Sequence, residues 1–233
     1  STADVSVVGL RAIPSVEVSG TSTNTTLGFS SATVTAGAAD EISIAVNGAA
    51  TVAPATITAN GIETIKVATT GSATGSSANT LSIASNAATT LNVTGSVAAW
   101  LAVNLAGATA STVGTVTSDD GAHDIAITAD ATDKLSVSLG AGNDALRIAN
   151  IAATHTLAGG AGTDTLVTSA AITTVTGANI SEFEAVEIRG GVSVALPLTA
   201  NPVAALTIRD AAGGTLTGLA SGGTVTLSTG GNA

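Results

Sequence analysis

Short runs in which apolar and polar residues alternate recur along the whole chain, and most are bounded by Gly, Asn, Ser or Asp. Alternation with a period of two is typical of β-strands that bury one face, whereas the spacing typical of amphipathic helices is almost absent. The expected strands are Val5–Val8, Val16–Val18, Ile42–Val46, Ile65–Val67, Leu81–Ile83, Leu91–Val93, Leu101–Leu105, Val113–Thr117, Ile125–Thr128, Leu135–Leu139, Leu146–Ile148 and Thr165–Val167.

From residue 81 onwards these runs follow one another about every ten residues, so about twenty residues hold two strands and two turns. This period predicts an all-β chain built as a parallel β-solenoid, similar to a β-roll. An antiparallel sandwich is the alternative, because it also shows turn signals at about this spacing. Residues 1–60 have longer gaps and contain Pro14 and Pro54, which favours an irregular or sandwich-like N-terminal β region. We therefore expect two parts, 1–60 and a solenoid at 61–233.

The apolar residues are small. They make up 45% of the chain, yet the only aromatic residues are Phe29, Trp100 and Phe183, and Met and Tyr are absent. A globule with two thick layers usually needs bulkier side chains. Stacked rungs, each repeating the one before, can be filled by Val, Ile, Leu and Ala. The composition therefore supports the solenoid.

The charge is sparse and acidic, with 16 Asp and Glu against 6 Lys and Arg and a net charge of −10. The basic residues are scattered singly, which argues against nucleic-acid binding and leaves cations as the favoured ligands. Because Cys is absent, a metal is the obvious alternative to disulfides as a staple.

No apolar run is long enough to span a membrane. Since no signal peptide is seen and the chain begins at Ser1, we expect a segment of a longer polypeptide.

The clearest chemical motif is Gly159–Val167, which matches the calcium-binding nonapeptide G-G-x-G-x-D-x-U-x at every specified position. Glycines in such a turn allow the backbone to present carbonyl oxygens inward, and the Asp adds a carboxylate. A second copy, Leu139–Arg147, lacks only the first Gly, and a weaker copy lies at Asp119–Ile127.

The three copies place Asp124, Asp144 and Asp164 twenty residues apart, so the solenoid period predicts one column of carboxylates. Stacked carboxylates about 4.8 Å apart repel each other unless a cation lies between them. A turn role alone would also explain Gly and Asp at these positions. The predicted calcium-binding residues are Gly140, Gly142, Asn143, Asp144, Gly159, Gly160, Gly162 and Asp164, with Asp120 and Asp124 from the weaker copy.

Nothing in the sequence indicates catalysis. The chain has only two His residues, His123 and His155, and it contains neither an H-E-x-x-H zinc motif nor a G-x-S-x-G nucleophile elbow. Glu182, Glu184 and Glu187 lack an accompanying aromatic platform for a sugar, so we interpret them as strand and turn surface. The protein is therefore not expected to be an enzyme.

These motifs resemble those of RTX (repeats-in-toxin) proteins, and within them the surface-layer proteins of Gram-negative bacteria. The composition is similar, and a segment of the type I-x-G-I-E-x-φ-x-φ, where φ is apolar, occurs at Ile57–Val67 and again at Ile180–Ile188, with Glu63 and Glu184 121 residues apart. A decayed nonapeptide at Ala36–Ile44 precedes the first copy, which suggests a long internal duplication.

The resemblance implies a secreted protein of the bacterial cell surface that folds with Ca²⁺ and self-assembles into a two-dimensional lattice (S-layer). Its implied partners are copies of itself and neighbouring domains of the same chain, with cell-surface polysaccharide as a further candidate. Two alternatives remain: an RTX adhesin or biofilm stalk that binds a partner, and an ice-binding solenoid with ranks of Thr. The absence of a clear aromatic or basic cluster counts against the adhesin. Thr mixed with Ser, Ala and Asn counts against ice binding.

Overall fold

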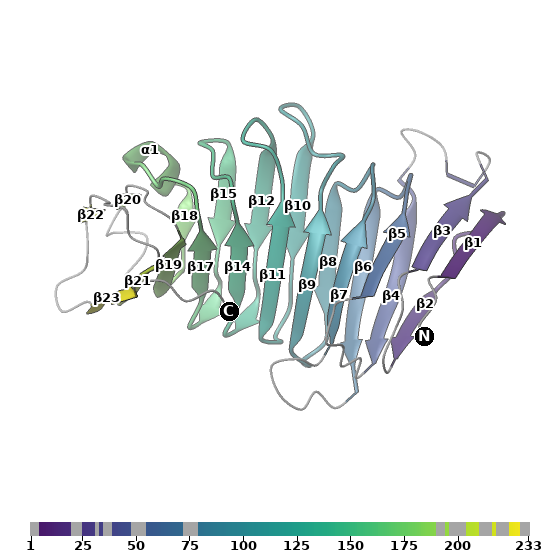
Figure 1. Cartoon of the computed structure of the whole chain (residues 1–233), viewed down its shortest axis with the longest axis horizontal. Helices are drawn as coiled ribbons and strands as arrows, with labels where there is room; N and C mark the ends of the chain where they lie inside the picture. The colour runs from purple at the N-terminus through teal and green to yellow at the C-terminus, as the bar shows by residue number, and fades with distance from the viewer. Residues whose placement is uncertain are drawn as a thin grey trace.

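The structure is a computed structural model that describes residues 5–19, 25–30, 33–34, 39–47, 55–71, 79–189, 194–195, 204–209, 216–217 and 224–228. Two long sheets run along the molecule from the N-terminal to the C-terminal end (Figure 1). Sheet A has eleven strands: β1 (Val5–Leu10), β3 (Thr25–Phe29), β5 (Ala55–Ala59), β7 (Thr80–Ala84), β9 (Ala99–Asn104), β11 (His123–Thr128), β14 (Ala145–Ile148), β17 (Thr165–Thr168), β19 (Ala185–Arg189), β21 (Ala205–Arg209) and β23 (Thr224–Ser228).

Sheet B and the smaller elements complete the architecture. Sheet B has eight strands: β2 (Val16–Ser19), β4 (Glu41–Asn47), β6 (Thr64–Thr70), β8 (Thr90–Thr94), β10 (Val113–Thr117), β12 (Lys134–Ser138), β15 (His155–Ala158) and β18 (Ile180–Ser181). Two small sheets pair β13 (Ala141–Gly142) with β16 (Ala161–Gly162) and β20 (Val194–Ala195) with β22 (Leu216–Thr217), and α1 covers Thr174–Gly177. No helix among the described residues is both long and apolar enough to cross a membrane.

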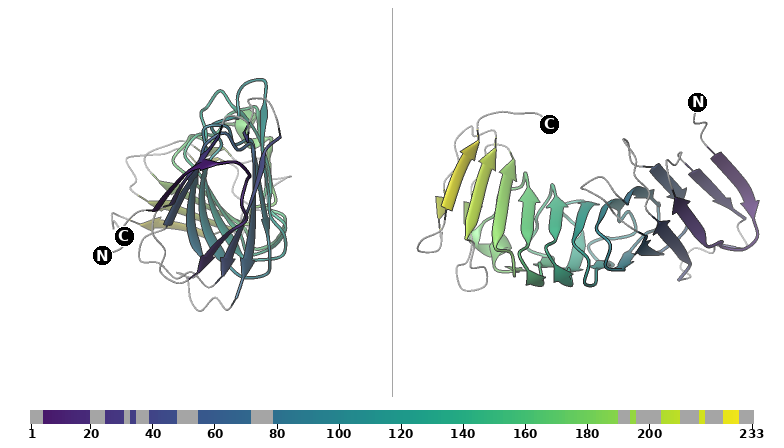
Figure 2. Two further views of the ribbon diagram at one scale, coloured as in Figure 1. Left: turned by 90° about the vertical axis from the view of Figure 1, so that its right-hand side faces the viewer. Right: turned by 90° about the horizontal axis from the view of Figure 1, so that it is seen from below.

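The chain winds as a parallel β-solenoid, which confirms the predicted fold class. Nearly every turn contributes one strand to sheet A and the next to sheet B, and each strand pairs in parallel with the strand one turn away. There are about eight turns, roughly 21 residues apart. The end-on view shows the two sheets facing each other around a narrow interior (Figure 2).

The interior is filled by columns of apolar side chains in register. One column of sheet A consists of Leu101, Ile125, Leu146, Leu166 and Val186, all at most 2% exposed. Burying an aliphatic side chain of this size stabilises the fold by about 1.5–3 kcal/mol. Because each residue stacks on a similar one from the next turn, Val, Ile and Leu suffice for the core, as the composition predicts.

The N-terminal part differs from the sandwich that its sequence suggests. Its spacing is irregular as expected, since Thr25 pairs with Ile57 and Val16 with Ile44, steps longer than those of the later turns. Its described strands nevertheless pair in parallel within the same two sheets. The β4–β6 and β5–β7 pairs continue both sheets across residue 60. The longer steps between these strands therefore leave the architecture unchanged.

Candidate metal site at one corner of the solenoid

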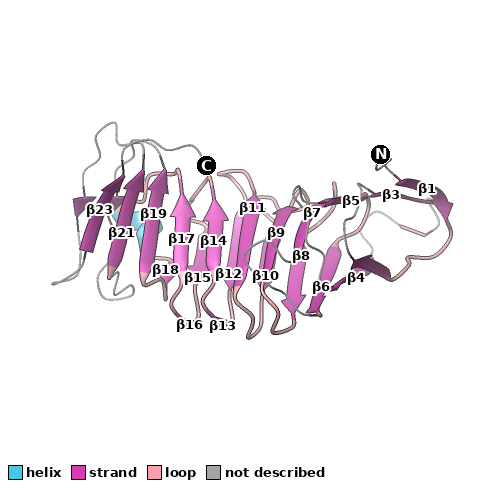
Figure 3. Cartoon of the chain, turned by 60° about the horizontal axis from the view of Figure 1, so that its bottom comes forward, coloured by secondary structure: helices cyan, strands magenta, loops and turns pink. Residues whose placement is uncertain are grey.

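The two nonapeptide turns lie one above the other where the chain passes from sheet B into sheet A (Figure 3). The first leads from β12 to β14 and the second from β15 to β17. Gly142 and Gly162 have φ angles of +144° and +141°, a conformation that favours glycine, and a Cβ on Gly162 would collide with the carbonyl oxygen of Gly142. Close contacts with backbone of the neighbouring turn also surround the predicted Gly140, Gly159 and Gly160.

Four residues at the start of successive sheet A strands form what we call the corner column: His123, Asp144, Asp164 and Glu184. The side chain of each acidic member accepts a hydrogen bond from the backbone N–H of the member one turn earlier. The N–H of His123 donates to Asp144 Oδ1 at 2.7 Å, that of Asp144 to Asp164 Oδ1 at 2.8 Å, and that of Asp164 to Glu184 Oε2 at 2.8 Å.

The second carboxylate oxygens of Asp144 and Asp164 have no hydrogen-bond partner although they are buried. Asp144 is 2% exposed and Asp164 is 0% exposed. Burial raises the pKa of Asp144. Burial also raises the pKa of Asp164, to about 6, and the negative charges of Asp144, Glu184 and Glu182 add to this effect. Burying a carboxylate oxygen without a hydrogen-bond partner costs free energy of folding. A positive charge bound at this corner would offset that cost.

Asp124 and Asp120 do not belong to the corner column, which corrects the expectation for the weaker copy. Asp124 pairs in register with Ala145, so the step between these turns is 21 residues and not twenty. A shift by one residue turns a side chain to the other face of a strand. Asp124 therefore lies on the outer face of sheet A, where both its oxygens accept hydrogen bonds from Arg147 at 2.6 Å. Asp120 is exposed.

His123 takes the place that Asp124 was expected to fill. It is 1% exposed, neither ring nitrogen has a hydrogen-bond partner, and Nε2 lies 3.6 Å from Asp119 Oδ1. Asp119 Oδ2 accepts the N–H of Gly95 at 2.7 Å. The alternation of β11 could have revealed this placement, because a residue two positions before the inward Ile125 must also point inward.

The remaining predicted residues lie at or near the corner in supporting roles. Asn143 Oδ1 accepts the N–H of Thr163 at 2.9 Å, which ties the two exposed turns together. Glu184, interpreted from the sequence as surface, is the third carboxylate of the column. Asp130 and Asp133 lie in the turn between β11 and β12, at the opposite corner, where Asp133 Oδ2 accepts the N–H of Asp130 at 2.7 Å.

The buried second oxygens of Asp144 and Asp164 are the side-chain oxygens that this corner offers to a metal ion. Within the described part of the chain, no three His, Cys, Asp or Glu side chains are grouped to hold a metal ion. A site built on Asp144 and Asp164 would therefore depend on backbone carbonyl oxygens. Calcium accepts such mixed sets, with six to eight oxygens at about 2.3–2.6 Å.

Comparison of the chain with models of protein families, with curated proteins and with solved structures gives no match. The corner column and the solenoid architecture are therefore the observations from which a function can be inferred.

Proposed function

We propose that this chain is a calcium-stapled structural segment of a bacterial surface layer, and that it is not an enzyme. In this proposal Ca²⁺ binds at the corner column, the protein is secreted to the cell surface, and copies of the chain assemble into a lattice. The observation that carries the proposal is a parallel solenoid whose first and last described strands leave inward-facing apolar residues uncovered.

Support for calcium comes from the unpartnered oxygens of Asp144 and Asp164. They lie in adjacent turns at the same register, fully buried, with raised pKa values. Glycines around them allow the backbones of the two turns to approach closely. A divalent cation would neutralise both carboxylates and use the second oxygens that no protein group satisfies, which is the chemistry of the nonapeptide motif.

Support for assembly comes from the two end strands of sheet A. Val7 pairs with the buried Leu27, and Val225 pairs with Leu206, so both valines face inward. Each is nevertheless 40% exposed, whereas Leu206 is 0% exposed. Unprotected edges of parallel strands template further pairing. A second copy placed head to tail, or a neighbouring domain of the same chain, would continue the parallel order of sheet A, which a head-to-head contact would not.

Cysteine cross-linking tests this arrangement directly, because the natural chain has no Cys. Val7→Cys and Val225→Cys variants are prepared separately and oxidised alone and as a mixture, with calcium present. Head-to-tail assembly predicts disulfide dimers in the mixture and few in either variant alone. Dimers in each single variant but not preferentially in the mixture would contradict it.

Electron microscopy and light scattering across a calcium titration test the function as a whole. We expect ordered sheets at calcium concentrations equal to or above those that fold the chain, and none with chelator. A folded, calcium-loaded chain that stays monomeric at high concentration and binds a sugar or host protein would contradict the lattice proposal.

One observation favours the adhesin or stalk as a second candidate. The outer face of sheet A carries Trp100 next to Asp124 in register, and Asp124 binds Arg147. Beside them lies a shallow groove of about 250 Å³ whose lining includes Arg147, Val167 and Arg189. Such a surface could contact a saccharide, and a glycan-binding screen that compares the natural chain with Trp100→Ala separates this candidate from the lattice.

A further inference from the structure

The outer face of sheet A gathers basic residues that lie far apart in the sequence. Arg147 on β14 and Arg189 on β19 each follow a buried core residue, so both side chains point away from the core. The strand register also places Arg209 of β21 beside Arg189. Three of the six basic residues of the chain therefore lie on strands of sheet A between β14 and β21, although the net charge is −10.

Arg147 and Arg189 each bind a carboxylate and keep unused donors. Nε and Nη2 of Arg147 donate to Asp124, both at 2.6 Å, and Nε of Arg189, whose side chain is 52% exposed, donates to Glu187 at 2.8 Å. Among the described residues, Nη1 of Arg147 and both terminal nitrogens of Arg189 have no hydrogen-bond partner. Since a guanidinium has five N–H donors, both arginines can bind a further acceptor.

The shallow groove of about 250 Å³ lies between these two arginines. Its lining includes the apolar side chains of Ala126, Ala149 and Val167, and Ser169 adds a hydroxyl group. Val167 points outward but is only 5% exposed. An ion pair formed over an apolar floor is screened less by water than one at an open surface. The groove therefore fits a carboxylate that approaches from outside.

A second copy of the chain can supply that carboxylate. Each chain carries 16 acidic residues against 6 basic ones, so two copies repel each other on average. A groove lined by two arginines is a place where this repulsion turns into attraction. Opposite charges across a contact also fix its orientation and exclude wrong partners.

The outer face of sheet B offers a matching surface. Its strands carry two carboxylates, Glu17 on β2 and Glu41 on β4. Glu41 pairs with Lys66 at 2.8 Å, whereas Glu17 is exposed and, within the described part of the chain, makes no ion pair. Between β8 and β15 one row of outward residues in register consists of uncharged hydroxyl side chains: Thr90, Thr115, Ser136 and Thr156.

We propose that the groove between Arg147 and Arg189 binds Glu17 of a second copy, and that this is the lateral contact of the lattice. The inference rests on the assembly proposed above and deepens it. Head-to-tail stacking alone gives a fibre, and a sheet needs a contact in a second direction. Because the contact joins opposite faces of the solenoid, it is heterologous, and each copy can bind one neighbour on either side.

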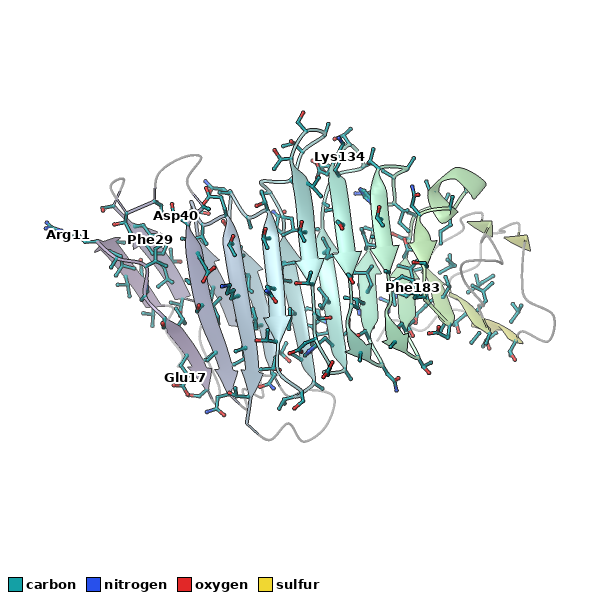
Figure 4. All side chains as sticks on the ribbon, turned by 180° about the vertical axis from the view of Figure 1, so that it is seen from behind. Arg11, Glu17, Phe29, Asp40, Lys134 and Phe183 are labelled. Carbon is teal, nitrogen blue, oxygen red and sulfur yellow. The ribbon has the colours of Figure 1, made fainter. Side chains whose placement is uncertain are left out.

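Charge reversal tests the contact, with the full chain in saturating calcium viewed by electron microscopy. The variants are Arg189→Glu, Glu17→Arg and the two combined. The matched control is Lys134→Glu, which makes the same change in charge on β12, five strands from Glu17 in the order of sheet B (Figure 4 labels both residues). Circular dichroism and the melting temperature check that each variant is folded.

We expect sheets from the natural chain and from Lys134→Glu, single fibres from each of the other two single variants, and sheets again from the combined variant. High salt should also separate the sheets into fibres. Sheets from Arg189→Glu, or no recovery in the combined variant, would overturn the lateral contact and leave the head-to-tail contact standing. Binding of polygalacturonate that Arg189→Glu abolishes while its sheets persist would assign the groove to an acidic saccharide instead. A natural chain that stays monomeric in calcium would overturn the proposed assembly, and the lateral contact with it.

Discussion

Asp164→Asn is the substitution for which the structure makes the sharpest prediction. The pKa of Asp164 in the folded chain is about 6, above its ordinary 3.8, mainly because burial disfavours the charged form. The folded chain therefore holds the proton more tightly than the unfolded chain. Without calcium, the contribution of Asp164 to the free energy of unfolding is highest below about pH 4 and is lost as the pH rises through about 6.

The magnitude follows from the shift. A difference of about two pKa units corresponds to about 3 kcal/mol of free energy of unfolding, as an upper bound because the neighbouring carboxylates titrate together. Asn carries no charge, and its amide oxygen can still accept the N–H of Asp144. In chelator at about pH 7.5, Asp164→Asn should be more stable than the natural chain by up to about 3 kcal/mol, and the two should converge near pH 4.

Calcium should reverse this order. Saturating calcium stabilises only the chain that can bind it well, so the natural chain should become more stable than Asp164→Asn. Urea unfolding followed by circular dichroism, with and without chelator at both pH values, measures all the differences. Asp120→Asn, an exposed carboxylate outside the column, is the control and should show neither effect. If Asp164→Asn is the less stable chain in chelator at neutral pH, the reasoning about the buried charge is refuted.

Three further substitutions test the turn geometry, the outer-face ion pair and the buried core separately. Gly162→Ala places a Cβ against the Gly142 carbonyl at a positive φ, so calorimetry should show a loss of about 2 kcal/mol or more. Asp124→Asn breaks the outer-face pair with Arg147, so it should cost less than about 1 kcal/mol and leave calcium affinity unchanged in a titration. Leu166→Ala opens a cavity in a fully buried column and should cost about 2–5 kcal/mol in urea unfolding. A calcium affinity that depends on Asp124 would contradict its placement outside the column.

The alternation of apolar and polar residues and the regular spacing of the strands predict the parallel solenoid and most of its central strands. Each predicted run from Val5 to Val167 overlaps a strand, with Leu105 and Leu139 one residue beyond β9 and β12, and the twenty-residue spacing of Leu146 and Leu166 gives the correct register. The N-terminal strands were harder to place, because long loops and prolines hide the period there. Parallel pairing joins residues that lie a whole turn apart in the sequence, and such contacts leave no local signal where the turns differ in length.

The sequence predicts the corner column correctly where the nonapeptide is well preserved, and the prediction is wrong where the nonapeptide is degenerate. Asp144 and Asp164 share a column as the motif indicates. Asp124 does not, because a single extra residue in the preceding turn shifts the register, and counting twenty residues cannot detect that shift. Glu184 was interpreted as surface, as a charged side chain outside the nonapeptides usually is. Its position two residues before the inward Val186, matching Asp164 before Leu166, was the available signal.

Thermal unfolding of the natural chain during a calcium titration, followed by circular dichroism, tests the central claim most directly. We expect the melting temperature to rise steadily with calcium and excess chelator to return it to its lowest value. Asp144→Ala combined with Asp164→Ala should remove the response. Identical spectra and melting temperatures with calcium and with chelator would contradict the claim that a metal staples this corner.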